Sequence, residues 1–168
     1  AKEGRLFKGV LYAGLMIHEG TAKVLEFNAR FGDPETQPIM SRLDTDLIDI
    51  IEAILDGALA RVAMSWKPDS AVCVVMASGG YPGEYEKGRE ISGLEKAATR
   101  QQVMVFHSGT AKKNGKVVTD GGRVLGVTGL GASVAAAIDR AYAGVRDIYF
   151  EGAHYRHDIG ARALEEGN

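Results

Sequence analysis

Residues 23–37 read KVLEFNARFGDPETQ, and this stretch decides how the first part of the chain folds. Polar and apolar residues alternate over residues 23–30, as they do in a β-strand, where every second side chain points to the same face. One face of this predicted strand carries Val24, Glu26, Asn28 and Arg30, and the other carries Leu25, Phe27 and Ala29. We expect the apolar face to pack on a core and the polar face to line a cleft.

The segments on either side predict the neighbours of this strand. Residues 6–17 (LFKGVLYAGLMI) are typical of a strand, and HEGTA turns the chain, so an antiparallel hairpin is expected. Asp33 suits a helix N-cap and Pro34 the first helical position, which predicts a short helix over residues 35–42. A second helix is predicted over residues 44–56, ending at Gly57, with an apolar stripe that we expect to be core. The stripe comprises Leu47, Ile48, Ile51, Ile54 and Leu55.

The pattern of apolar and turn-forming residues changes after MSWKPDS (residues 64–70), a polar segment that contains a proline. We place a domain boundary there. Strands are expected over AVCVVMASGG, VMVFHSG and GGRVLGVTGLG, with a hairpin turn at KKNGK. Residues 133–148 predict an amphipathic helix capped by Ser133. Gly129-Leu130-Gly131 looks like half of a dinucleotide fingerprint, but Val134 stands at the sixth position, so a plain strand-to-helix turn is expected.

The composition excludes several classes of protein. With 45% hydrophobic and 25% charged residues, the 168-residue chain has the composition of a soluble globular protein, and no stretch is long and apolar enough to span a membrane. The net charge of -2 does not favour a nucleic-acid-binding protein, because such proteins usually carry an excess of basic residues. The one cysteine, Cys73, cannot form an internal disulfide, which fits a reducing compartment, and we expect the cytoplasm. The chain has no initiator Met, so we expect it to begin inside a longer sequence.

The polar face of the strand over residues 23–30 has the chemistry of a metal and anion site. Glu26 and Asn28 supply hard oxygen atoms of the kind that Mg²⁺ prefers, with phosphates and water completing the octahedron. Arg30 could neutralise a carboxylate or a transferring phosphoryl group. A structural ion pair near the end of a sheet explains the same residues equally well. Asp33 and Glu35 also fit the first turn of a helix, where acids complement the dipole.

Several sequence blocks, in order along the chain, resemble one enzyme family. They are LYAGLMI, VLEFNARFGDPETQ, VVMASGGYPGEY, HSGT, VVTDGGRVLGVT and YRHDIGARAL. From about Phe7 to Leu164 the chain is similar to the C-terminal part of the phosphoribosylamine–glycine ligases. The resemblance implies an α+β fold, with the C-terminal part of an ATP-grasp domain (an antiparallel hairpin plus helices) in residues 1–64 and a small mixed α/β C-terminal domain in residues 65–168.

The resemblance also implies a reaction in de novo purine biosynthesis. In that family ATP phosphorylates the carboxylate of glycine, and the amine of 5-phosphoribosylamine attacks the glycyl phosphate to give glycinamide ribonucleotide, ADP and phosphate. Glu26 and Asn28 match the metal-binding Glu and Asn, which would hold Mg²⁺ or Mn²⁺. Arg30 matches the arginine beside the reacting carboxyl group, and Asp33 would order the loop or contact the amine. Arg156 and Arg162 would help to bind the ribose phosphate.

The chain departs from the family pattern in three respects. The preceding strand lacks the further metal-binding acid of many ATP-grasp enzymes, so a second metal ion would need ligands from elsewhere. The terminal motif reads Arg156-His157-Asp158 where the family usually has Arg-Lys-Asp. The family's N-terminal part is missing, so we expect this chain to be inactive alone. Alternatives are a non-catalytic binding or scaffold module derived from such a ligase, and an ATP-grasp ligase for another amine.

Overall fold

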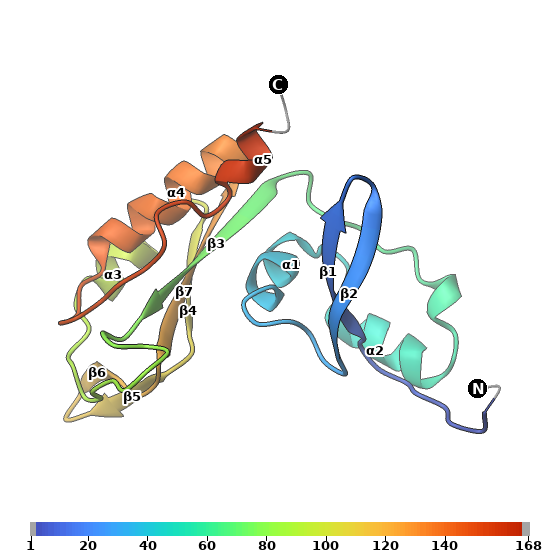
Figure 1. Cartoon of the computed structure of the whole chain (residues 1–168), viewed down its shortest axis with the longest axis horizontal. Coiled ribbons are helices and arrows are strands. Elements are labelled where there is room, and N and C mark those ends of the chain that lie inside the picture. The colour runs from blue at the N-terminus through green and yellow to red at the C-terminus, as the bar shows by residue number, and fades with distance from the viewer. Residues whose placement is uncertain (1–2, 166–168) are drawn as a thin grey trace. The chain divides into compact units, whose positions relative to one another are not determined.

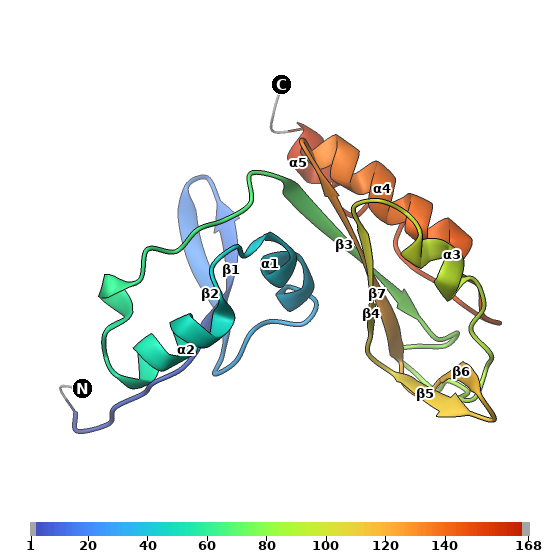
Figure 2. The same ribbon diagram turned by 180° about the vertical axis from the view of Figure 1, so that it is seen from behind.

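The computed structural model describes residues 3–165, which form two compact units (Figures 1 and 2). The first unit comprises the chain up to Thr36 together with Leu43–Lys67, and the second comprises Gln37–Arg42 together with the chain from Pro68. The fold is a mixture of helices and antiparallel sheets, as expected. None of the helices within residues 3–165 has the length and apolarity needed to cross a bilayer. The assignment of residues 1–64 and 65–168 to two domains of a larger enzyme remains a prediction.

The predicted hairpin is present in the first unit. Strands β1 (Tyr12–His18) and β2 (Thr21–Asn28) pair antiparallel. Strand β1 is shorter than its predicted range, and β2 begins and ends two residues earlier than predicted. Glu19 and Gly20 connect them with φ angles of 48° and 73°. Two consecutive residues with positive φ form the type of two-residue turn whose twist matches that of a hairpin.

A β-bulge changes which side chains of β2 share a face. Glu26 lies opposite Gly14, whereas Val24 lies opposite Leu15, so Leu25 is an extra residue on β2. Because Gly14 and Leu15 point to opposite faces of β1, their partners also point to opposite faces. The prediction that Val24 shares the face of Glu26 is therefore wrong.

The first unit leaves most of its apolar side chains uncovered. Leu25 and Phe27 are 65% and 61% exposed, so the prediction that they pack on a core does not hold within the described residues. Helix α2 (Leu47–Leu55) begins at the N-cap Asp46 and is followed by Gly57 at φ 70° and by the short 3₁₀ helix η1 (Leu59–Arg61). The expected core stripe of α2 is wrong at three positions, because the side chains of Ile48, Ile51 and Leu55 are exposed. An apolar pattern identifies side chains that can be buried, and burial needs a covering element.

Helix α1 (Thr36–Arg42) starts one residue later than predicted. Residues 33–35 form a turn instead, and the carbonyl oxygen of Gly32 accepts hydrogen bonds from the amide (3.1 Å) and the hydroxyl (2.5 Å) of Thr36. Asp33 is therefore not the N-cap and Pro34 is not the first helical residue. The rest of α1 belongs to the second unit, where the Ser41 hydroxyl lies 3.7 Å from Met104 Sδ.

The second unit is built around a three-stranded antiparallel sheet with β7 in the centre (Figure 2). Strands β3 (Ser70–Ala77) and β4 (Val103–His107) pair with opposite edges of β7 (Arg123–Gly131). Helix α4 (Val134–Asp147) packs on this sheet, and its predicted cap is confirmed because Ser133 Oγ accepts a hydrogen bond from the Ala136 amide at 3.2 Å. The fully buried core side chains are Val74, Met76, Ala97, Val124, Leu125, Val127, Ala137, Ala141, Val145 and Phe150.

Two glycines of β7 allow α4 to lie directly against the sheet. A Cβ atom at Gly129 would overlap backbone atoms of Ala137 and Ala141, and one at Gly131 would lie 2.6 Å from the Ala137 amide nitrogen. Both glycines lie inside β7, so the predicted strand-to-helix turn at Gly129–Gly131 is wrong. They are needed for close helix–strand packing rather than for a turn.

Smaller elements complete the second unit. Strands β5 (Thr110–Lys113) and β6 (Lys116–Thr119) form a hairpin whose turn at Asn114-Gly115 confirms the turn predicted for KKNGK. Helix α5 (Ala161–Glu165) follows the last loop.

An ion-pair cluster ties α3 (Leu94–Ala98) to the end of α4. The Asp147 carboxylate, which is only 3% exposed, accepts hydrogen bonds from Arg100 and lies 2.8 Å from Lys96 Nζ. These bonds, first that from Arg100 and then that from Lys96, hold the pKa of Asp147 well below its ordinary value.

Candidate functional site

The two predicted metal ligands lie on one face of the hairpin. Glu26 and Asn28 are two residues apart in β2 with no bulge between them, so their side chains share a face. Glu26 is exposed and Asn28 is half-buried. Their partners in the register, Gly14 and Tyr12, occupy the same face on β1. The acid and the amide are therefore side by side, as predicted from alternation.

Gly14 provides the space into which Glu26 extends. A Cβ atom built at Gly14 would lie 3.1 Å from Cγ of Glu26. The carboxylate stem thus lies across β1, where any larger residue would crowd it. The absence of an acid on this strand, which the sequence shows, coincides with the presence of the smallest residue opposite Glu26.

Tyr12, on this face, and Glu35, which is bonded to it, were not predicted as members of the site. The Tyr12 hydroxyl donates a hydrogen bond to Glu35 Oε1 at 3.2 Å, which joins β1 to the turn before α1. Burial raises the pKa of the Tyr12 hydroxyl first, and the hydrogen bond to Glu35, then the charges of Glu35 and Glu26, raise it further. The Arg30 guanidinium acts on this pKa in the opposite direction. Three charged side chains therefore act on one phenol.

Arg30 lies beyond the end of β2, so strand alternation does not fix its direction. Its positive charge acts to lower the pKa of the Tyr12 hydroxyl. One nitrogen, Nη1, donates to the carbonyl oxygen of Phe31 at 2.7 Å. Asp33 is exposed in the turn over residues 33–35. Its predicted part in catalysis stays a prediction.

The donor set on this face suits a hard divalent cation. Within residues 3–165 no cluster of three or more His, Cys, Asp or Glu side chains could hold a metal ion by itself. Mg²⁺, however, is usually held by one or two protein oxygens together with phosphates and water. Glu26 and Asn28 supply two such oxygens beside the space above Gly14. The residues therefore fit a metal ion that is shared with a phosphorylated ligand.

The predicted phosphate-binding arginines lie in the second unit. Arg156 directs its fork at Asp158, with Nε–Oδ1 and Nη2–Oδ2 distances of 2.9 and 2.7 Å. The pKa of Asp158 is lowered mainly by this hydrogen bond, and the charge of Arg162 lowers it slightly further. The positive charges of both arginines therefore act on one carboxylate. Their charges exceed that of Asp158 by one, so the cluster retains a positive charge for an anion.

His157 occupies the position where the family usually has lysine. Its ring lies 4.7 Å from the ring of Tyr155, centroid to centroid. This contact gives the imidazole a packing role beside the arginine cluster.

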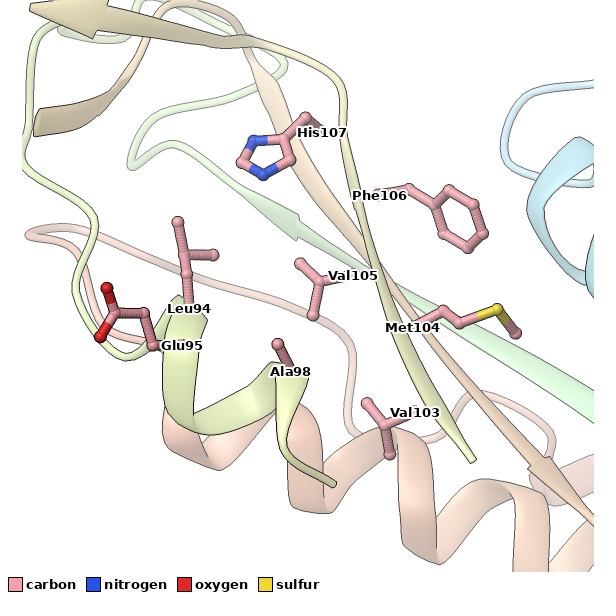
Figure 3. Close-up of a pocket in the computed structure, with 8 residues that line it drawn as sticks. All are labelled: Leu94, Glu95, Ala98, Val103, Met104, Val105, Phe106 and His107. Carbon is pink, nitrogen blue, oxygen red and sulfur yellow. The ribbon is translucent and has the colours of Figure 1, made fainter. Parts of the chain in front are cut away.

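The second unit also has a largely apolar hollow between α3 and β4. The hollow has a volume of about 540 Å³, and Figure 3 shows Leu94 and Ala98 of the helix facing Val103 and Val105 of the strand. At its end, His107 Nδ1 lies 3.0 Å from Thr110 Oγ1. Apart from Glu95 and His107 the lining is uncharged, so the hollow lacks groups that would bind a phosphate.

Comparison with known families identifies both parts of the chain. The family described as "Phosphoribosylglycinamide synthetase, C domain" matches residues 71–162. The "Phosphoribosylglycinamide synthetase, ATP-grasp (A) domain" matches residues 1–36, which include the hairpin and Glu26, Asn28 and Arg30.

Curated relatives carry a consistent name. The chain is 54% identical over 160 residues to a phosphoribosylamine–glycine ligase of Caldanaerobacter subterraneus, which covers 95% of this chain and 38% of that protein. It is 54% identical over 165 residues to the phosphoribosylamine–glycine ligase of Pseudomonas aeruginosa, covering 98% of this chain and 38% of that protein. The chain therefore spans somewhat over a third of the length of these relatives.

A solved structure agrees with these matches. The crystal structure of phosphoribosylamine–glycine ligase from Thermotoga maritima superposes with a TM-score of 0.80 and 38% sequence identity, covering 94% of this chain and 38% of that one. The C-domain match alone covers 92 of the 168 residues, counted from residue 71 to residue 162. The chain belongs to the phosphoribosylglycinamide synthetase family, whose curated members are named phosphoribosylamine–glycine ligases.

Proposed function

We propose that this chain is the C-terminal part of an ATP-dependent ligase that joins glycine to 5-phosphoribosylamine in purine biosynthesis. The products would be glycinamide ribonucleotide, ADP and phosphate. The single observation that carries the proposal is the shared face of Glu26 and Asn28, within a segment that matches the family's ATP-grasp domain. The names of the relatives supply the substrates.

Glu26 and Asn28 would hold Mg²⁺ or Mn²⁺ through their side-chain oxygens. When bound, the ion would neutralise charge on the phosphates of ATP and polarise them toward the carboxylate of glycine. Gly14 leaves room for Glu26 to reach that position. Arg30, whose Nη1 donates to the Phe31 carbonyl oxygen, would stabilise the anionic carboxylate and the acyl phosphate through its guanidinium group.

Asp33, Arg156 and Arg162 would each act on the amine substrate, phosphoribosylamine. Asp33, which is exposed in the turn before α1, would order that turn or contact the amine of phosphoribosylamine. Arg156 and Arg162 would bind the ribose phosphate, for which guanidinium forks are suited. Because Asp158 already occupies the fork of Arg156, Arg162 would supply the larger part of the free positive charge.

The first unit would need the remainder of an ATP-grasp domain to complete it. Its hairpin exposes large apolar side chains on both faces, and α2 does so as well. Exposed apolar surface on this scale is typical of an interface with further protein. We therefore expect the isolated chain to form no ADP from ATP, glycine and phosphoribosylamine, and the complete ligase to do so.

Substitution of Glu26 in the complete ligase tests the proposal. Glu26→Gln keeps the size of the side chain and one oxygen atom but removes the negative charge that strengthens binding of a divalent cation. We expect kcat to fall by roughly 10²-fold or more, the usual scale when metal-assisted charge stabilisation is lost. Glu19→Gln, at the exposed turn of the same hairpin, is the matched control and should leave kcat unchanged. Near-normal kcat of Glu26→Gln at saturating Mg²⁺ would contradict the metal-binding role.

A further inference from the structure

Tyr12 connects the groups that surround the predicted metal site. It lies directly opposite Asn28 in the hairpin, so its side chain shares the face of Asn28 and Glu26. Its hydroxyl donates to Glu35 Oε1 at 3.2 Å. The proposed mechanism uses neither Tyr12, which lies on this face, nor Glu35, which is bonded to it.

Gly32 allows the Tyr12–Glu35 pair to form. Gly32 is buried, and a Cβ atom there would overlap Glu35 Oε2 and approach the Tyr12 ring to 3.0 Å. The carboxylate and the aromatic ring therefore both lie over this glycine. The hydrogen bond spans 23 residues of sequence and joins β1 to the turn that follows β2.

The Tyr12–Glu35 hydrogen bond ties β1 to the turn that follows β2. Asn28, which pairs with Tyr12, is the last residue of β2, so this bond restrains the segments on either side of a proposed metal ligand. Outer groups that restrain metal ligands are commonly worth about 10- to 100-fold in metal affinity or activity.

We propose that Tyr12 is a positioning residue of the ligation site, which holds Glu35 over Gly32 and so keeps the ligand-bearing face of β2 in its productive geometry. The inference rests on the proposed function. Because Tyr12 acts through a hydrogen bond, the acceptor oxygen of Glu35 matters and its negative charge does not. Removal of either partner should have the same effect as removal of both.

Four variants of the complete ligase separate this role from a merely structural one. We expect Tyr12→Phe and Glu35→Ala each to lower kcat about 10-fold, the lower end of the range for groups that orient metal ligands. The double variant should lose no more than either single variant, since the two residues act as a unit. Glu35→Gln should retain kcat within about 3-fold, because the amide oxygen can still accept the hydrogen bond. Tyr149→Phe, at an exposed tyrosine of the second unit, is the matched control and should match the unmodified enzyme.

Mn²⁺ binding gives a readout that is independent of turnover. Titration of Mn²⁺ in the presence of a non-hydrolysable ATP analogue, followed by electron paramagnetic resonance, should show about 10-fold weaker binding in Tyr12→Phe and unchanged binding in Tyr149→Phe. Unchanged Mn²⁺ affinity in Tyr12→Phe, or Glu35→Gln as damaging as Glu35→Ala, would overturn the inference. An unmodified complete ligase that forms no ADP would instead refute the proposed function.

Discussion

Substitution of Gly14 by alanine should reduce catalysis without reducing stability. The added Cβ would lie 3.1 Å from Cγ of Glu26, whereas ordinary van der Waals contact begins at 3.4 Å, so Glu26 must move by a few tenths of an ångström. Gly14 does not have a positive φ, so alanine is compatible with its backbone conformation. The substitution therefore perturbs the position of one proposed metal ligand and little else.

The size of the effect follows from this displacement. A misplacement of 1 Å in an active site can cost about 10²-fold in rate, so a shift of roughly 0.3–0.5 Å should lower kcat by about 4- to 10-fold. Replacing a glycine in a compatible conformation reduces the entropy of the unfolded chain and contributes about 0.4–1 kcal/mol of stability. The expected signature is thus a slower enzyme with an unchanged or higher Tm.

The assay is steady-state ADP release by the complete ligase over a range of Mg²⁺ concentrations, with Tm measured by scanning calorimetry. Ala22→Ser is a suitable control, because it adds one heavy atom to the same hairpin near the turn, where Ala22 pairs with Ile17. The control should change neither quantity. If Gly14→Ala kept full kcat and the same Mg²⁺ dependence, the position of Glu26 would not matter, and the metal-binding face would be misassigned.

Three further predictions concern other parts of the chain. Arg30→Lys should lower kcat of the complete ligase by about 10-fold, because lysine keeps the charge but loses the fork, and equal activity would make Arg30 structural. The lowered pKa of Asp147 stabilises the fold above the ordinary carboxyl pKa of about 4, and this contribution is lost as the pH falls below it. Asp147→Asn should therefore lower Tm at pH 7 and flatten the decline of Tm between about pH 4 and pH 2, as thermal melts across that range would reveal. Gly129→Ala should destabilise the second unit by about 3 kcal/mol, since α4 must shift away from the backbone overlap, and a melt with unchanged Tm would contradict the packing described for β7.

The position of Glu26 and Asn28 was predictable because it depends on strand alternation over two residues. The rest of the site depends on contacts that alternation does not encode. The bulge at Leu25 moved Val24 to the other face, and only the cross-strand register brings Tyr12 opposite Asn28. The hairpin turn is Glu19-Gly20 rather than Asn-Gly or Asp-Gly, so the sequence gives no strong signal for that register.

The fold of the second unit was largely predictable, and the burial in the first unit was not. Ser133, the Asn114-Gly115 turn and the apolar strands each carry a local signal that the structure confirms. Ile48 and Phe27 belong to patterns as apolar as any core, yet nothing within the described residues covers them. Periodicity reports the face of an element that prefers burial, whereas the covering surface lies elsewhere in the protein.

The grouping of Gln37–Arg42 with the second unit has a consequence for the order of synthesis. These residues leave the ribosome before the strands they pack on, since Ser41 contacts Met104 and Gln37 lies beside Gly126. Helix α1 therefore lacks its packing partners until β4 and β7 have been translated. In a nascent chain that stalls before β7, α1 would have no strand to pack on. A protease could then cleave residues 37–42 until translation resumed.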